Sequence, residues 1–198
     1  MDLLLATRNP HKTREFRELL GKNFKLIDLT ALPEIAIPEE TGRTFKENAT
    51  LKAIAASKKL PSLVVADDSG LEVDALEGAP GIFSARYANE NANAEENISK
   101  LLRELSTRNI AAEKRSARFR CVIALTRAGK LLGIFEGVVE GSIVDPARGA
   151  GGFGYDPVFQ PTGFERTFAE MPPELKNKIS HRAQAIAALR EGLRDIAN

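Results

Sequence analysis

The chain has 198 residues, of which 43% are hydrophobic and 28% charged, and its formal net charge is +1. A chain of this length buries roughly 70% of its unfolded surface, so one domain forms without disulfides or a structural metal. The balanced charge argues against nucleic acid polymers as partners, and the apolar runs are too short for a membrane span. One cysteine and two histidines offer little material for disulfides or zinc, so we expect a reducing, cytoplasmic setting.

The first quarter of the chain predicts a strand, a helix and a second strand. Residues 3–6 form a short apolar run. Asn9 is a good N-cap and Pro10 suits the first helical position, so we predict a helix over 10–20. Residues 24–29 alternate between apolar and polar side chains, as a strand does.

The next segment predicts a helix followed by a short strand. Thr44 and Glu47 have the spacing of a capping box, which begins a helix that extends to about residue 60. The apolar run 63–66 predicts a buried strand, and the Asp-Asp-Ser-Gly sequence at 67–70 has the composition of a turn.

The remaining elements complete a mixed sheet. A capped helix is predicted over 93–105, two strands over 117–126 and 131–140 form a hairpin, and a last helix covers 182–196. Helices alternate with strands before the hairpin, which indicates an α/β fold. We therefore predict that the whole chain is a single domain, with a mixed central sheet flanked by helices.

The first candidate site is the turn between the first strand and the first helix, with Thr7, Asn9 and Lys12. Backbone N–H groups at a helix N-terminus attract anions, and Lys12 would add a full charge. The GxxxxGK[ST] pattern of a P-loop is absent. The alternative interpretation is an ordinary capped helix with a solvated lysine.

The second candidate is Asp67 and Asp68, with Glu40 in an upstream loop. Two carboxylates about 4 Å apart repel by roughly 4 kcal/mol at an effective dielectric constant near 20, so one is protonated or a cation lies between them. Mg²⁺ suits such a place. Neighbouring strand residues point to opposite faces, so only one aspartate should face a given site. The alternative is a common Asp-Asp turn.

The third candidate is the glycine-rich loop at 149–157, GAGGFGYDP. Its glycines allow the backbone to approach a ligand closely, or simply to form an irregular turn. Phe153 and Tyr155 could stack on a base, and the alternative is that they fill the core.

Basic side chains near the end of the chain form the fourth candidate. His181 and Arg182 carry donors that can recognise a carbonyl group, although such a pair is commonly exposed. Lys176 is a solvated lysine by default. Lys52, on the predicted helix after Thr44, either extends along the packed face to solvent or points into a cleft.

Taken together, these segments resemble the inosine triphosphate pyrophosphatase family, whose members hydrolyse non-standard purine nucleoside triphosphates. Five motifs in family order carry the resemblance, and they extend over nearly the whole chain: TRNPHK (7–12), EETGRTFKENATLKA (39–53), ADDSGLEVDALEGAPGIFSARY (66–87), GGFGYDPVF (151–159) and ISHR (179–182). The resemblance implies two lobes around an active-site cleft, and a homodimer.

The resemblance also implies roles for the first three groups of residues. Thr7, Asn9 and Lys12 would grip the triphosphate, and the substrate-binding residues of the same turn would also include Arg8, Pro10 and His11. Many relatives have glycine where Arg8 and His11 stand, which leaves the backbone conformation of this loop open. Glu40 and Asp68 resemble ligands of Mg²⁺, which Mn²⁺ could replace. Asp68 would also deprotonate the attacking water, with Asp67, Lys12 and Lys52 in support.

Further residues would contact the nucleotide, the last two of them near the base: Ser69, Phe153, Gly154, Tyr155, Asp156, Lys176, His181 and Arg182. The implied reaction converts ITP, dITP or XTP with water into the monophosphate and pyrophosphate. Three alternatives stay open at this point. They are a pyrophosphatase for modified pyrimidine or methylated nucleotides, a nucleotide sensor without catalysis, and a plain phosphatase that releases orthophosphate.

Overall fold

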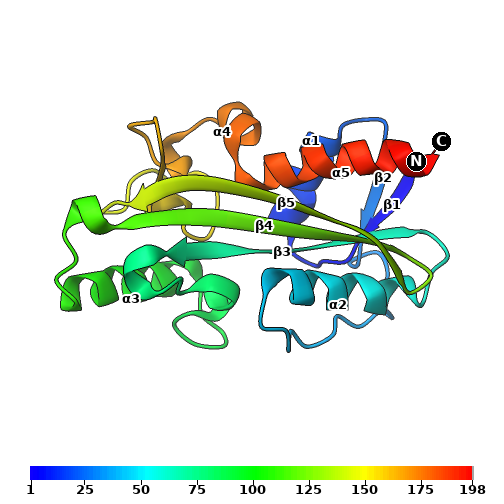
Figure 1. The fold of residues 1–198 in the computed structure, drawn as a ribbon, viewed down its shortest axis with the longest axis horizontal. Coiled ribbons are helices and arrows are strands. Elements are labelled where there is room, and N and C mark those ends of the chain that lie inside the picture. The colour runs from blue at the N-terminus through cyan, green and yellow to red at the C-terminus, as the bar shows by residue number, and fades with distance from the viewer. Residues whose placement is uncertain (198) are drawn as a thin grey trace. The chain divides into compact units, whose positions relative to one another are not determined.

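The computed structural model describes residues 1–197 (Figure 1). Its strands and longer helices follow in this order: β1 (Asp2–Leu5), α1 (Pro10–Leu20), β2 (Lys25–Asp28), α2 (Phe45–Ser57), β3 (Leu63–Val73), α3 (Ala94–Thr107), β4 (Ser116–Arg127), β5 (Lys130–Ile143), β6 (Phe159–Pro161), α4 (Pro173–Ile179) and α5 (His181–Ala197). The strands form one sheet in the order β2-β1-β3-β4-β5-β6. β1 is parallel to β2 and β3, whereas β5 and β6 are antiparallel, so the predicted mixed sheet is confirmed.

The chain divides into two compact units. The first unit comprises Met1–Asp68, Cys121–Gly137 and Arg182–Asn198, and the second comprises Ser69–Arg120 and Val138–His181. The second unit therefore interrupts the first twice in sequence, and each has a hydrophobic core of its own. No helix among residues 1–197 is both long enough and apolar enough to cross a membrane.

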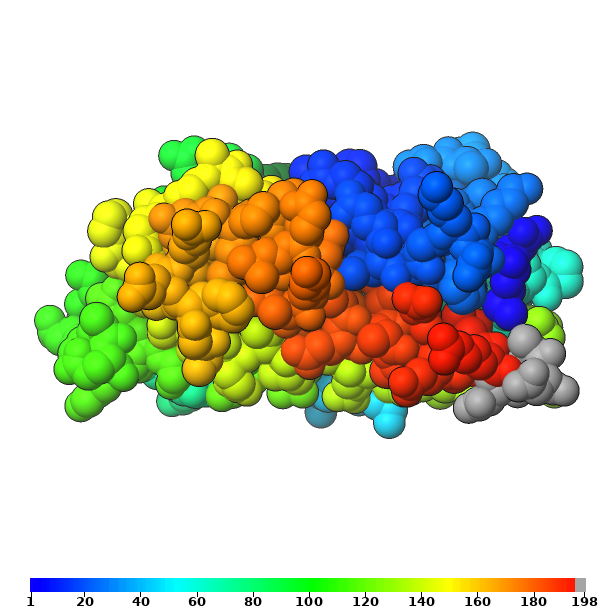
Figure 2. Space-filling model, turned by 90° about the horizontal axis from the view of Figure 1, so that it is seen from above, coloured from blue at the N-terminus to red at the C-terminus, as the bar shows by residue number. Residues whose placement is uncertain are grey.

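The core of the first unit lies where α1 and α5 pack on its strands. Leu5 of β1, Phe16 of α1 and Leu189 of α5 are fully buried there. Figure 1 shows α1 and α5 on one side of these strands and α2 on the other. In the space-filling view the blue N-terminal residues and the red residues of α5 are neighbours on the visible face (Figure 2). α1 begins and ends as predicted, because Asn9 caps it and Gly21, with a φ of 75°, ends it.

The first turn of α2 differs in one detail from the predicted capping box. Thr44 Oγ1 accepts a hydrogen bond from the amide of Glu47, as predicted. The Glu47 carboxylate accepts from the amide of Arg43 rather than from that of Thr44, so the second half of the box is wrong. The glutamate thereby fixes the residue that precedes the cap, and the loop before α2 is held against the helix.

The predicted turn at 67–70 is wrong, because β3 continues through it to Val73. Leu71 and Val73 are fully buried and belong to the core of the second unit. The burial of these apolar side chains outweighs the turn preference of the Asp-Ser-Gly sequence. Asp67 and Asp68 consequently lie inside a strand, where their side chains point to opposite faces.

Aromatic side chains pack against one another in the core of the second unit. The rings of Phe119 and Phe159 lie 4.7 Å apart, and those of Phe159 and Phe168 lie 5.2 Å apart. The predicted capped helix is α3, which begins with a complete capping box at Asn93 and Glu96. Both sides of the box are satisfied, so the start of this helix is fixed by its local sequence.

Candidate active site

The carboxylates of Asp67 and Asp68 pair with cations from different helices. Asp67 Oδ2 lies 2.9 Å from Lys12 Nζ of α1 and 3.2 Å from Arg182 Nη2 of α5. Asp68 Oδ1 lies 3.0 Å from Lys52 Nζ of α2. α1 and α5 lie on one side of β3 and α2 lies on the other. Asp67 therefore pairs with cations on one face of the strand, and Asp68 pairs with a cation on the opposite face. This is the separation that strand geometry predicts.

Lys52 lies between two carboxylates. Its Nζ is 2.6 Å from Glu40 Oε1 and 3.0 Å from Asp68 Oδ1, and only 8% of its side chain is exposed. Burial alone would lower the pKa of Lys52, but the negative charges of Asp68, Asp67 and Glu40 outweigh it and raise the pKa. Lys52 is therefore a buried, firmly charged ammonium group, and it points inward rather than to solvent.

Burial raises the pKa of Asp68 above its ordinary value of 3.8. Lys52 and Lys12 oppose this shift, while the negative charge of Glu40 adds to it. A carboxylate with a raised pKa is a stronger base than an exposed one, because proton transfer to it costs less free energy. Asp68 thus has the property that the proposed role in deprotonating water requires.

One oxygen of Asp68 is left without a hydrogen bond. Its Oδ2 is buried and accepts no hydrogen bond from any residue in the 1–197 range. Leaving a buried carboxylate oxygen unsatisfied is costly, so such an atom points to a missing cation or donor. Glu40, whose side chain is 24% exposed, approaches the same Lys52. The unsatisfied Oδ2 of Asp68 and the carboxylate of the partly exposed Glu40 are oxygen ligands of the kind that a hard cation such as Mg²⁺ prefers.

A closed metal cage is not built into the described residues. No group of three or more His, Cys, Asp or Glu side chains within residues 1–197 is arranged to hold a metal ion. Mg²⁺ typically uses one or two carboxylates and takes its other ligands from water and phosphate. The pair of Glu40 and Asp68 fits this pattern, in which the substrate completes the coordination.

The backbone amides of the turn before α1 are hydrogen-bonded within the turn. The amides of His11 and Lys12 donate to Asn9 Oδ1 at 2.9 and 3.3 Å, and the Asn9 amide donates to Thr7 Oγ1. The predicted N-cap is confirmed, and its side chain uses the amides at positions 11 and 12. That this turn binds an anion stays a prediction, and the charge for it would come from the ammonium group of Lys12, whose side chain is 17% exposed.

Arg8 and Pro10 shape the same turn. The Arg8 Nη2 atom donates to the carbonyl oxygens of Pro33 and Ile35 at 3.2 and 2.9 Å, so this arginine holds the loop that follows β2. Pro10 occupies the first helical position as predicted. Whether either residue also contacts phosphate stays a prediction.

Arg182 is one of the most buried side chains, with 2% exposure. Its Nη1 donates to the carboxylate of Glu15 and its Nη2 to that of Asp67. Burial alone would lower its pKa, but the two carboxylates raise it. The default of an exposed His-Arg pair is wrong, because Ser180, His181 and Arg182 are all buried.

Glu15 is the residue of this network that the sequence analysis missed. It lies three residues after Lys12 on α1, and only 8% of it is exposed. A carboxylate on the inner face of a helix, next to the core residue Phe16, was the available signal. Nothing in the local sequence shows that its partner lies 167 residues away.

In the second unit, Lys176 is buried rather than solvated, so its default interpretation is wrong. Its Nζ lies 2.7 Å from Asp156 Oδ2 and 5.0 Å from the centre of the Phe153 ring. The same Asp156 oxygen accepts a hydrogen bond from the amide of Phe153 at 2.8 Å. Gly152, with a φ of 71°, leaves the space that this carboxylate occupies, and Gly154 has a φ of 60°. The glycine-rich loop thus folds around Asp156.

The other candidate residues of the second unit lie in separate surroundings. The ring of His181 stacks on Phe119, with centres 4.8 Å apart and planes 12° apart. Tyr155 fills the core, as one of its two interpretations predicted, and its hydroxyl donates to the Ser84 carbonyl at 3.0 Å. Ser69 is half-buried in β3. In the first unit, Cys121 is fully buried in the core.

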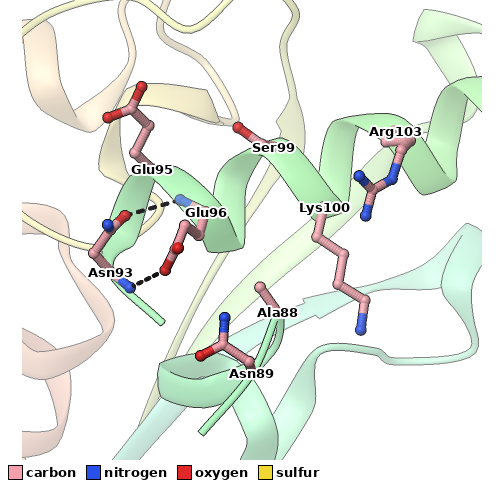
Figure 3. Close-up of a pocket in the computed structure, with 8 residues that line it drawn as sticks. All are labelled: Ala88, Asn89, Asn93, Glu95, Glu96, Ser99, Lys100 and Arg103. Atoms are coloured by element: carbon pink, nitrogen blue, oxygen red, sulfur yellow. Dashed lines mark hydrogen bonds between the residues drawn. The ribbon is translucent and has the colours of Figure 1, made fainter. Parts of the chain in front are cut away.

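A hollow of about 580 Å³ lies beside the first turns of α3 (Figure 3). Its lining is polar and comprises Ala88, Asn89, Asn93, Glu95, Glu96, Ser99, Lys100 and Arg103. Asn93 and Glu96 are committed to the capping box drawn there. The Lys100 ammonium group donates to the Tyr87 carbonyl at 2.7 Å. None of the predicted site residues lines this hollow.

The mixed sheet and the buried clusters in which lysine and arginine pair with carboxylates define an α/β protein with a charged site. A model of the Ham1 family matches residues 3–192, and the chain belongs to that family. It is 48% identical to a dITP/XTP pyrophosphatase of Geobacillus kaustophilus, over 98% of this chain and 95% of that protein. It is also 46% identical to a dITP/XTP pyrophosphatase of Bacillus subtilis, over 95% and 94% of the two chains.

Solved structures agree with this assignment. A Ham1 protein of Coxiella burnetii superimposes with a TM-score of 0.88 at 44% identity, covering 98% of this chain and 99% of that one. The Staphylococcus aureus Ham1 protein gives a TM-score of 0.86 at 42% identity, with the same coverage. The observed α/β fold is thus that of the family.

Proposed function

We propose that this protein hydrolyses non-standard purine nucleoside triphosphates, namely dITP, XTP and ITP, to the monophosphate and pyrophosphate. Relatives that carry the name dITP/XTP pyrophosphatase at 46–49% identity over nearly the whole chain support the substrate class. The single observation that carries the reaction is the buried Asp68, whose Oδ2 lacks a hydrogen bond within residues 1–197 while its Oδ1 pairs with Lys52.

In the proposed reaction, water attacks the α-phosphorus. The new bond joins the water oxygen to this phosphorus, the bond from the α-phosphorus to the bridging oxygen breaks, and pyrophosphate leaves. Asp68 orients the water and accepts its proton, and the raised pKa of Asp68 supports that role. Lys12 and Lys52 counter the charge of the triphosphate, which is the main requirement of phosphoryl chemistry.

The proposed metal is Mg²⁺, which Mn²⁺ can replace, and Glu40 and Asp68 would hold it. When bound, such an ion neutralises charge on the phosphate oxygens and the leaving group. Asp67 supports the site from the other face of β3, because it fixes Lys12 and Arg182. Glu15 assists by sharing Arg182.

The proposed nucleotide contacts of the second unit are Ser69, Phe153 to Asp156, Lys176 and His181. Rejecting ATP by a factor of 10⁴ requires about 5.5 kcal/mol, whereas one unpaired buried polar group costs about 1–3 kcal/mol. More than one donor must therefore recognise the 6-oxo group. Both terminal nitrogens of Arg182 already donate to carboxylates, so we assign recognition of the base primarily to His181.

We further propose that the enzyme is a homodimer and acts in the cytoplasm, where it cleanses the nucleotide pool. The assignment to a reducing compartment is supported by the single cysteine, which is buried. The near-zero net charge supports a small-molecule substrate rather than a nucleic acid polymer.

The deciding experiment is product analysis with Mg²⁺, in which dITP, ITP and XTP are compared with ATP and GTP. We expect monophosphate and pyrophosphate from the non-standard purines, and little turnover of ATP or GTP. Orthophosphate as the product, or equal turnover of all five nucleotides, would overturn the proposal. Binding without turnover would indicate a nucleotide sensor instead.

A further inference from the structure

A hydrogen bond fastens the loop that carries Glu40 to the first turn of α2. The amide of Gly42 donates to Asn48 Oδ1 at 2.8 Å. Asn48 lies on the inner face of α2 and is fully buried. On the exposed side, the Arg43 amide donates to the carboxylate of Glu47 at 2.6 Å. The loop is therefore bound to the helix on two sides, and Asn48 provides the buried contact.

The close approach of Gly42 to α2 leaves no room for a larger side chain. A Cβ atom at this position would lie 2.6 Å from Asn48 Oδ1 and 2.7 Å from Glu47 Cβ. These distances are shorter than any normal van der Waals contact, so any side chain would push the loop away from the helix. The hydrogen bond to Asn48 thus depends on glycine at position 42.

The hydrogen bonding of Asn48 does not make this residue a strong contributor to stability. Asn48 Oδ1 accepts a hydrogen bond from the Gly42 amide. The other end of the side chain is therefore its NH₂ group, which is a donor. That Nδ2 atom is buried and has no hydrogen-bond partner in the part of the chain that the structure describes. A buried donor without an acceptor lowers stability. The net value of Asn48 to folding is therefore reduced, and its distinctive effect is on the position of the loop.

Asn48 also stands at a particular place relative to the charged groups. Gly42 follows Glu40 by two residues, and Asn48 precedes Lys52 by one turn of α2. Glu40 Oε1 lies 2.6 Å from Lys52 Nζ, which is 3.0 Å from Asp68 Oδ1. Asn48 thus fixes the separation between the loop that carries one carboxylate and the helix that faces the other.

We propose that Asn48 is a positioning residue that, through Gly42, holds the Glu40 carboxylate where it can share a divalent cation with Asp68. The inference rests on the proposed function, because it assumes the metal pair of Glu40 and Asp68. Residues that orient metal ligands typically change metal affinity by about 10- to 100-fold when removed. Asn48 touches neither the metal nor the substrate in this proposal.

The test is Mn²⁺ binding, measured by electron paramagnetic resonance with a dITP analogue that cannot be cleaved between the α- and β-phosphates. We expect Asn48→Ala to weaken Mn²⁺ binding by about tenfold. A matched control is Ser57→Ala, since Ser57 Oγ accepts the amide of Gly129 at 3.0 Å and is fully buried at the other end of α2. Both substitutions remove a buried acceptor for a glycine amide, but only Asn48 serves the loop of Glu40.

Gly42→Ala provides a second, independent variant, which also serves if Asn48→Ala does not fold. It should weaken Mn²⁺ binding to a similar extent, and the double variant should be no weaker than the poorer single variant, because both changes release the same loop. Wild-type Mn²⁺ affinity in both single variants would overturn the inference, as would equal weakening in Ser57→Ala. Absence of Mn²⁺ binding in the wild type would overturn it too.

Failure of the proposed function gives a different result. In that case the wild-type protein releases no pyrophosphate from dITP, whatever the metal-binding behaviour of the variants. If the wild type is active and Mn²⁺ binding is unaffected by the loss of Asn48, only the positioning inference fails.

Discussion

Asp68 Oδ1 and Lys52 Nζ lie 3.0 Å apart, and each side chain is only 8% exposed. A buried ion pair of this kind contributes little net stability, because removing two charges from water costs about as much as their attraction returns. The pair is better understood through chemistry. Lys52 keeps a positive charge next to a carboxylate that burial has made more basic, and the two groups are ready before any ligand arrives.

Asp68→Asn should abolish turnover without unfolding the protein. The amide has the size of the carboxylate but cannot accept a proton, so we expect kcat for dITP to fall by about 10²- to 10⁴-fold. The free energy of unfolding should decrease, because the buried Lys52 loses the charge of one of its two carboxylate partners, but Glu40 remains as the other. Steady-state kinetics and urea unfolding measure the two effects. A kcat near that of the wild type would contradict the assignment of Asp68 as the base.

Asp67→Asn should act mainly on stability. Asp67 Oδ2 faces both Lys12 and Arg182, and removing one partner of a buried ion pair costs about 3–5 kcal/mol. Urea unfolding of the variant gives this value directly. The control is Glu140→Gln. The Glu140 side chain is 59% exposed and pairs with Arg118, so its loss should cost less than about 1 kcal/mol. Equal losses in the two variants would show that Asp67 is not a stabilising centre.

His181→Ala should reduce the preference for ITP over ATP. If one donor to the 6-oxo group is lost, kcat/KM for ITP should fall about tenfold relative to that for ATP. His11→Ala is the informative comparison, because His11 belongs to the predicted triphosphate turn and the two substrates share their phosphates. That variant should alter both substrates equally. An unchanged ratio in His181→Ala would place recognition of the base elsewhere.

Thr13→Val should cost stability at neutral pH but not in acid. Burial would raise the pKa of Asp28, but hydrogen bonds from Thr30 and from Thr13, the latter at 2.7 Å, lower it below the ordinary value of 3.8. The stabilisation is therefore present above that value and is lost as the pH falls through the lowered pKa of the folded state. We expect a cost of about 1.5–3 kcal/mol at pH 7, as for a hydrogen bond to a charged group.

Unfolding of wild type and Thr13→Val over a range of acidic pH values measures this difference. The cost should shrink as Asp28 becomes protonated. Thr13→Ser keeps the hydroxyl group but loses a buried methyl group, so its difference from the wild type should not change with pH. A cost that does not change with pH would show that poor packing of the added methyl group, rather than loss of the hydrogen bond to the carboxylate, accounts for it.

Elements with strong local signals could be predicted from the sequence. Asn9, Pro10 and Gly21 define both ends of α1, because capping and the left-handed conformation are properties of a few neighbouring residues. The turn between β4 and β5 is of the same kind, since Ala128 and Gly129 both adopt positive φ there. The mixed sheet follows from the order of such elements.

The burial of charged side chains could not be predicted in the same way. Arg182 and Lys176 have the composition of solvated residues, and their burial depends on carboxylates that are distant in sequence, such as Glu15 and Asp156. The misassigned turn at 67–70 has a related cause. Two aspartates are tolerated inside β3 only because Lys12, Arg182 and Lys52 compensate them, and no window of a few residues contains that information.

The pairing of Arg182 with Glu15 and Asp67 also has a consequence for biosynthesis. The two carboxylates lie within the first 67 residues of the chain, but the arginine that neutralises them is added near the end of translation. Until then the nascent first unit holds two acidic groups that lack this cation, and a message truncated before codon 182 would never supply it. Completion of the first unit therefore waits for the last helix, whereas the residues of the second unit have by then all been synthesised.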